Sequence, residues 1–97
     1  MAENFVIKQE PHGGKMRYVT TVDGYESEMT YLTPNPKKIV IDHTLVAPEL
    51  KGRGVGQALL LRAIEDARKG GYKIEPTCPF AKAQIEKHQE WQDVLAR

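Results

Sequence analysis

The sequence predicts an α/β (α+β) fold, a mixed sheet of about five strands with a central βαβ unit and a C-terminal helix. Three observations predict it. Short segments that alternate apolar and polar residues fill the first third of the chain, as strands do. An apolar run that ends at Val46 then leads into a glycine-rich turn and a helical pattern. A second helical pattern closes the chain.

The first part of the chain predicts three antiparallel strands. Their expected bounds are 5–9, 15–22 and 25–33. Pro11-His12-Gly13-Gly14 supplies the first turn and Asp23-Gly24 is a two-residue hairpin signal. Pro34-Asn35-Pro36 is expected to end the third strand, because proline has no N–H to give to a ladder. In the second strand, Met16, Tyr18, Thr20 and Val22 share one side, and this alternation predicts a strand with one face partly buried.

The middle of the chain predicts a βαβ unit. Residues 39–46 are apolar on both faces, as expected for a strand at the centre of a sheet. A helix is expected from about Val55 until Gly70-Gly71 stops it. The fifth strand, 72–75, should lie parallel to the fourth through a right-handed crossover. Pro79 suits a first helical position, so Cys78 is the predicted N-cap of a last helix, about 80–95.

Composition limits the class of protein. The 97 residues predict one domain, 1–97, with a small core. A net charge of +1 does not favour nucleic-acid binding. With one cysteine, the chain cannot form an internal disulfide. The N-terminal residues lack the apolar run of a signal peptide, so we expect no signal or membrane segment. We expect a cytoplasmic monomer or weak dimer that binds neither nucleic acid nor membranes, and no metal, because no histidine has ligand spacing.

The glycine-rich stretch is the main functional signal. Three glycines, Gly52, Gly54 and Gly56, lie between a strand and a helix. The unpaired N–H groups and dipole of a helix start, together with glycine turns, favour a bound phosphate. Gln57 stands where a Walker A loop or a dinucleotide fingerprint beginning at Gly52 would need a glycine, so neither motif is present.

The stretch Lys51-Gly52-Arg53-Gly54-Val55-Gly56 resembles the acyl-CoA-binding motif of the Gcn5-related N-acetyltransferases. A small YjdJ-type branch of that superfamily is similar to this sequence at the turn and at two further segments, 42–46 and 76–81. The resemblance covers nearly the whole chain. It implies acetyl-CoA or coenzyme A as cofactor, with the pyrophosphate on the turn and the pantetheine arm between the fourth and fifth strands. The implied cofactor-binding residues are Leu45, Val46, Lys51, Gly52, Arg53, Gly54, Val55, Gly56 and Gln57.

The chain departs from the superfamily pattern at several points. Lys51 replaces the usual arginine or glutamine, and Phe80 lies where many members have a tyrosine acid. Longer members have helices between their first two strands, and the pattern of this sequence shows none there. It also shows no counterpart of their last two strands. Much of the usual acceptor surface is therefore missing.

Two residues are candidates for catalysis. Cys78, at a predicted helix start beside the implied acyl group, is a candidate nucleophile for an acyl-cysteine intermediate. A lone cysteine is equally explained as a small buried apolar residue. His43 is a candidate general base or activator of Cys78. Its expected face also holds Ile39, Ile41 and Leu45, which is typical of a core histidine.

Three functions follow from these observations. The first is transfer of an acyl group from coenzyme A to an unidentified small-molecule or protein amine. The second is a non-catalytic module that binds coenzyme A or acyl-CoA. The third is an interaction protein whose glycine turn binds no cofactor.

Overall fold

The computed structural model describes residues 5–96. Five strands form one sheet in the order β1-β2-β3-β4-β5, with β1 to β4 antiparallel and β5 parallel to β4, which confirms the predicted mixed sheet and βαβ unit. The strands are β1 (Lys8–His12), β2 (Lys15–Val22), β3 (Tyr25–Asn35), β4 (Lys38–Leu45) and β5 (Lys73–Pro76). The helical segments are η1 (Pro48–Leu50), α1 (Val55–Gly70), α2 (Pro79–Lys87) and η2 (Gln89–Val94).

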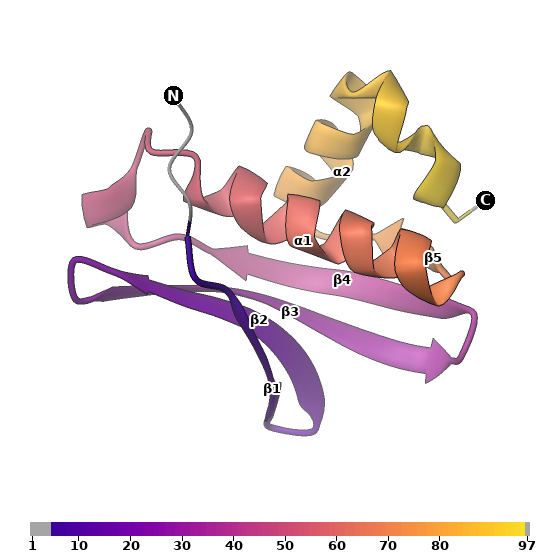
Figure 1. Cartoon of the computed structure of the whole chain (residues 1–97), viewed down its shortest axis with the longest axis horizontal. Helices are drawn as coiled ribbons and strands as arrows, with labels where there is room; N and C mark the ends of the chain where they lie inside the picture. The colour runs from indigo at the N-terminus through magenta and orange to yellow at the C-terminus, as the bar shows by residue number, and fades with distance from the viewer. Residues whose placement is uncertain (1–4, 97) are drawn as a thin grey trace.

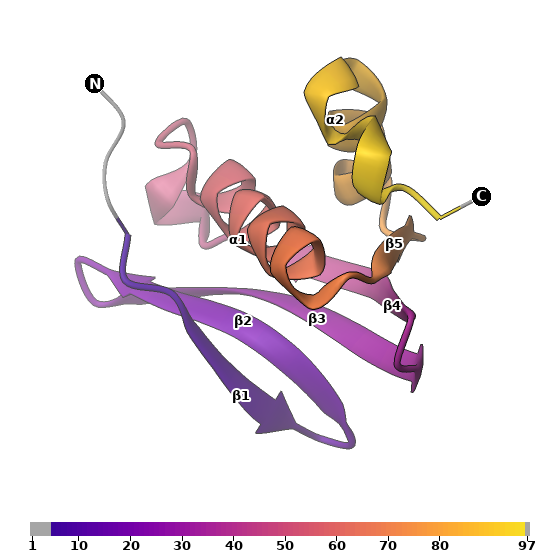
Figure 2. The same cartoon turned by 45° about the vertical axis from the view of Figure 1, so that its right-hand side comes forward.

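The helices α1 and α2 lie on the same side of the sheet, and α1 runs along it in roughly the direction of β4 (Figures 1 and 2). The core lies between α1 and the sheet. Tyr18, Met29 and Ile41 are fully buried there, as is the inner face of α1. The Tyr18 hydroxyl donates a hydrogen bond of 2.7 Å to Asp66 on α1, so a polar contact fixes the helix on the sheet. In β2, Tyr18 and Thr20 are buried on one face, and Val19 is buried on the other.

The predicted bounds of the first strand and the predicted end of the third strand are wrong, and both strands include a proline. The first strand covers Lys8–His12 rather than 5–9, and Pro11 pairs with Met16. Since β1 is an edge strand, the missing N–H of Pro11 breaks no central ladder. The third strand continues through Pro34 to Asn35. The pairing of β3 with β4 is irregular between Leu32 and Asn35, which leaves no regular hydrogen bond for Pro34 to interrupt.

The predicted last helix is interrupted. α2 ends at Lys87 because His88 has extended backbone angles (φ −109°, ψ 99°). The short helix η2 then turns back toward the sheet, which buries Val94 and brings the Ala96 N–H within 2.8 Å of the Ile74 carbonyl oxygen. A straight helix over 80–95 would not make this contact with β5. Tertiary packing therefore overrides the helical pattern of the sequence.

The fourth strand is covered on one face only. Tyr31 pairs with Ile41 whereas Thr30 pairs with His43, so Asp42 is an extra residue in β4, a β-bulge. Ile41 is fully buried, but His43 is exposed. The prediction that His43 shares a face with Ile39 and Ile41 is wrong, because the bulge shifts the alternation of side chains by one residue.

Candidate functional site

The glycine turn connects η1 to α1. Gly52 and Gly54 have φ angles of 84° and 77°, in the left-handed region that favours glycine. A Cβ atom on Gly52 would meet nothing within 4 Å, and one on Gly54 would meet only the Gln57 side chain, at 3.9 Å. The surface of the turn is therefore open to an approaching group.

The N-terminus of α1 supplies hydrogen-bond donors at this turn. Gly54 is the N-cap and no side chain caps the helix. The Ala58 N–H bonds the Gly54 carbonyl at 3.0 Å. The N–H groups of the three residues before Ala58 precede the first full turn of hydrogen bonds, so the helix offers them no carbonyl partner. An open turn next to unpaired donors and a helix dipole fits an anion such as pyrophosphate.

Strands β4 and β5 separate close to this turn. Their parallel pairing runs from Lys38 with Lys73 to Ile41 with Pro76. The N–H groups of Thr77 and Cys78 then both reach the Ile41 carbonyl oxygen, at 3.0 and 3.2 Å. Beyond this point the chain turns into α2, whereas β4 continues to Leu45. In the described residues, no strand pairs with the β5 side of β4 after Ile41.

Cys78 lies at this separation point. It is the N-cap of α2 and is followed by Pro79, as predicted. Its side chain belongs to the core and is 4% exposed. The Sγ atom lies 3.3 Å from the hydroxyl oxygen of Thr44 on β4. Burial agrees with the interpretation of Cys78 as a small core residue, and its position next to the separated strands agrees with the interpretation as a nucleophile.

The structure does not bring His43 and Cys78 together. Thr44 contacts Cys78 from the helix-covered side, and the neighbouring residue His43 projects from the other side of β4. No hydrogen bond joins His43 to Cys78 in the part of the chain that the structure describes. Thr44 was not singled out from the sequence. The only signal for it was the polar pair Asp42-His43 inside an apolar strand, which is compatible with a bulge.

Asp42, the extra residue of the bulge, lies in a polar cluster. Its carboxylate accepts a hydrogen bond from the Thr30 hydroxyl at 2.6 Å and pairs with Lys15. Burial acts to raise the pKa of Asp42, but the bonds from Lys15 and Thr30 outweigh it and hold this pKa below its usual value. Asp42 is therefore a carboxylate at neutral pH and holds the bulge to β2 and β3.

The other residues expected to bind the cofactor surround the turn. Leu45 is 54% exposed and Val46 is half-buried. Lys51 is exposed, and Arg53 forms an ion pair of 2.6 Å with Asp23 of the β2–β3 hairpin. Gln57 donates to the Gln84 side chain of α2 at 3.3 Å. The turn and the start of α1 are thereby connected to the β2–β3 hairpin and to α2.

Gly56 marks the closest approach of α1, β4 and α2. A Cβ atom on this residue would lie 2.9 Å from the Phe80 ring and 3.2 Å from a Val46 methyl group. Phe80 of α2 therefore packs directly on the start of α1. Glycine is required here for close packing, whereas at Gly52 and Gly54 it is required for backbone angles.

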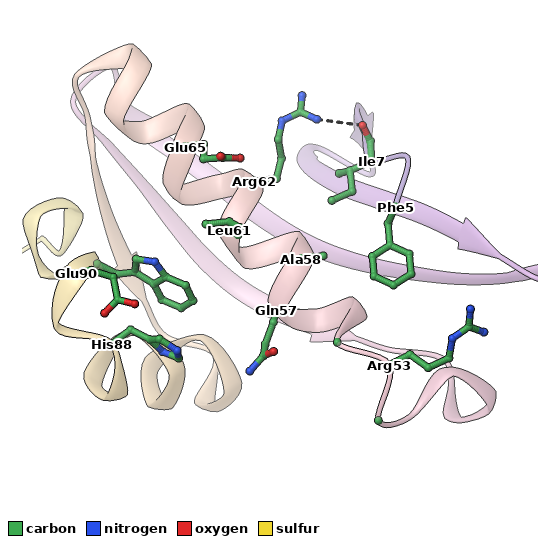
Figure 3. Close-up of a pocket in the computed structure, with 13 residues that line it drawn as sticks. Phe5, Ile7, Arg53, Gln57, Ala58, Leu61, Arg62, Glu65, His88 and Glu90 are labelled. Atoms are coloured by element: carbon green, nitrogen blue, oxygen red, sulfur yellow. Dashed lines mark hydrogen bonds between the residues drawn. The ribbon is translucent and has the colours of Figure 1, made fainter. Parts of the chain in front are cut away.

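A groove of about 810 Å³ extends from the glycine turn along the outer side of α1. We call it the α1 groove (Figure 3). Its floor includes Ala58 and Leu61 of α1. Figure 3 shows Phe5 and Ile7 on one side of α1 and His88 and Glu90 on the other, and the Trp91 ring stacks on His88. The sequence did not predict this groove, because its walls come from opposite ends of the chain.

No three His, Cys, Asp or Glu side chains within residues 5–96 form a group that could hold a metal ion. Across the same residues, none of the helices has the length and apolar character that crossing a membrane requires.

Comparison with known proteins places the fold in a family. Residues 17–94 match the family model described as GCN5-related N-acetyl-transferase. The solution NMR structure of a GCN5-like protein from Staphylococcus aureus, described as a candidate N-acetyltransferase, is 36% identical. That alignment covers 92% of this chain and 87% of the other, with a TM-score of 0.72. No significant match was found among curated protein sequences.

Proposed function

Because the chain belongs to the GCN5-related N-acetyltransferase family, we propose that it binds acetyl-CoA and transfers the acetyl group to an amine through Cys78. One observation carries this proposal. The glycine turn leads into the start of α1, which packs on Phe80 of α2, and Cys78, the N-cap of α2, lies where β4 and β5 separate, 3.3 Å from the Thr44 hydroxyl. The residues suited to a pyrophosphate and the candidate nucleophile therefore border one region.

The turn is the proposed pyrophosphate site. The N–H groups at the start of α1 donate to the phosphate oxygens, and the open surface at Gly52 and Gly54 admits them. On the side of β4 that faces β5, the backbone after Ile41 has no strand partner and provides hydrogen-bonding groups between the turn and Cys78. Acetyl-CoA supplies the activated thioester.

Cys78 is the proposed carrier of the acetyl group. Its thiolate attacks the thioester carbonyl, the carbon–sulfur bond to coenzyme A breaks, and the coenzyme A thiolate leaves and takes up a proton. Thr44 orients the sulfur, and its hydroxyl group donates a hydrogen bond to the sulfur when the thiolate forms. An amine then attacks the acetyl-cysteine carbonyl, the carbon–sulfur bond to Cys78 breaks, and the amide is released. The amine nitrogen loses a proton to solvent, and the departing Cys78 thiolate takes one up.

His43 has no step in this proposal. It is exposed on the helix-free face of β4, whereas Cys78 lies on the other side. An amine that attacks acetyl-Cys78 from the helix-covered side therefore does not meet His43, and its proton passes to solvent. Activation of Cys78 by His43 is not part of the proposal.

Mass spectrometry of the intact protein tests the covalent step. After incubation with acetyl-CoA, the native chain should gain the mass of one acetyl group, and Cys78→Ser should not give a thiol-linked adduct. Treatment with neutral hydroxylamine should remove the group, because it cleaves thioesters and leaves amides. If Cys78→Ser transfers acetyl groups to amines as fast as the native chain, the nucleophile role is wrong.

Two glycine variants test the pyrophosphate site. Gly54→Ala and Gly24→Ala both place a side chain at a φ angle near +80° in open space, so both carry a similar backbone strain of roughly 1–2 kcal/mol. Only Gly54 lies at the turn. Calorimetry should show weaker coenzyme A binding for Gly54→Ala and native affinity for Gly24→Ala. Equal affinities in the two variants would place the site elsewhere.

The second candidate function is a non-catalytic coenzyme A binding module. The burial of Cys78 favours it, since only 4% of the residue is exposed. Phe80, which has no proton to donate to a leaving thiolate, packs on Gly56 near the same point. This function predicts coenzyme A binding with neither an acetyl adduct nor amine acetylation, so the mass measurement separates it from the first.

A further inference from the structure

The α1 groove is continuous with the glycine turn and ends at an aromatic pair. Its lining includes Gly52, Arg53 and Gly54 at one end. At the other end, the rings of His88 and Trp91 stack with centroids 4.0 Å apart and an interplanar angle of 20°. Figure 3 shows Gln57, Ala58 and Leu61 projecting from α1 between the two ends.

We propose that the α1 groove binds the adenine of the coenzyme whose pyrophosphate lies on the turn, with the base stacked at the His88–Trp91 pair. This inference rests on the proposed function and assigns a recognition role to η2. The residues that line the groove indicate which end of the coenzyme it binds. The groove includes the turn but neither Thr44 nor Cys78, so it serves the nucleotide end of the ligand and not the acyl end.

The chemistry of the groove suits a purine. Ala58 and Leu61 give an apolar floor, and Leu61 is 40% exposed although it is a large apolar residue. Aromatic rings stack favourably on bases of any identity. Gln57, Glu65 and Glu90 at the rim provide polar groups for the amino group and ring nitrogens of the base. The volume of about 810 Å³ lies within the range of small-molecule sites.

The hydrogen bond that His88 makes to Gln84 leaves the other ring nitrogen, Nε2, as an acceptor for the base. Its Nδ1 lies 2.8 Å from the Gln84 carbonyl oxygen, which only accepts hydrogen bonds, so Nδ1 carries the hydrogen. In the neutral ring, Nε2 is then an acceptor. The same hydrogen bond holds the imidazole at the end of α2, where the Trp91 ring stacks on it. The break between α2 and η2 thus builds a fixed aromatic surface.

Fluorescence tests this assignment in the native chain, since Trp91 is its only tryptophan. Excitation at the red edge of tryptophan absorption avoids the adenine band. Coenzyme A and ADP should both quench Trp91 emission, because each places a base against the indole. The fragment 4′-phosphopantetheine, which lacks adenine, should bind without this quenching.

Two substitutions complete the test. Trp91→Ala should weaken coenzyme A binding about tenfold, the amount expected for one stacked base, and should leave 4′-phosphopantetheine affinity unchanged. Trp91→Phe keeps an aromatic ring and should restore most of the affinity. Circular dichroism and thermal unfolding check that both variants are folded, and if Trp91→Ala is unfolded the fluorescence result on the native chain decides.

The outcomes separate the two proposals. Coenzyme A binding by calorimetry with unchanged Trp91 emission would overturn the adenine assignment and leave the proposed function intact. Equal affinity for coenzyme A and 4′-phosphopantetheine would also overturn it. If coenzyme A shows no binding at millimolar concentration, the proposed function itself fails, and the adenine site fails with it.

Discussion

The Sγ atom of Cys78 lies 3.3 Å from the Thr44 hydroxyl, across the point where β4 and β5 separate. The thiol donates a hydrogen bond to this oxygen. A hydroxyl both donates and accepts, so the same contact can reverse and stabilise a thiolate. Thr44 is therefore placed to hydrogen-bond the sulfur of Cys78 without reacting itself.

We predict that Thr44→Val slows acetylation of Cys78 roughly tenfold, because one hydrogen bond to the reacting sulfur is lost. The rate of the mass increase with acetyl-CoA measures this effect. Thr77→Val is the matched control, since the Thr77 hydroxyl bonds the Ile41 carbonyl at 3.1 Å and not the sulfur. Native rates in Thr44→Val would show that the contact is only structural.

Gly56→Ala should destabilise the fold by about 1–3 kcal/mol, the usual cost of overpacking. The added methyl group would lie 2.9 Å from the Phe80 ring and 3.2 Å from Val46. Urea unfolding followed by circular dichroism measures the loss. In the Phe80→Leu background the same substitution should cost less, because the crowded ring is gone. Equal costs in both backgrounds would contradict the predicted contact.

Stability should fall in alkaline solution because of Tyr18. Burial first, and the hydrogen bond to Asp66 second, raise the pKa of this phenol above its usual value. The unfolded phenol ionises near pH 10 while the folded one keeps its proton, so its contribution is complete below about pH 10 and declines above it. Urea midpoints from pH 8 to 11 measure this trend.

Tyr18→Phe provides the comparison. It should lower the free energy of unfolding at neutral pH by about 1–3 kcal/mol, since Asp66 loses a donor, and should reduce the alkaline decline. Tyr25→Phe changes a tyrosine that is 42% exposed and should leave both quantities near native values. A similar alkaline decline in the native chain and Tyr18→Phe would rule out Tyr18 as its source.

Acid should weaken the bulge of β4 through Asp42. Its pKa is lowered in the folded state, so its stabilising contribution is present above the ordinary aspartate pKa and is lost as pH falls through the folded value. Asp42→Asn should therefore be less stable than the native chain at pH 7, and the difference should shrink below about pH 4. A difference that stays constant with pH would exclude this charge as its origin.

Much of the candidate site was predictable because its signals are local. The glycines of the turn, the helix that follows and the Cys78-Pro79 helix start each depend on a few adjacent residues. Such patterns set backbone angles directly, through glycine at positive φ and proline at a first helical position. The Asp23-Gly24 hairpin was predictable for the same reason, and both residues have positive φ.

The misassigned residues depend on contacts between distant segments. The bulge at Asp42 depends on pairing with Thr30 and Tyr31, and it moved His43 to the opposite face from Ile41. Neither strand alone specifies that register, because one residue of slip changes every face that follows. Thr44 thereby became the neighbour of Cys78.

Local residue patterns were thus enough to predict the order of strands and helices, the glycine turn and the helix start at Cys78. Packing between distant segments sets which side of β4 each residue faces, breaks the last helix at His88, and brings residues from the two ends of the chain together in the α1 groove. The reason is physical. Backbone preferences act within a few residues, whereas faces, breaks and grooves are set by burial of apolar surface between segments far apart in the chain.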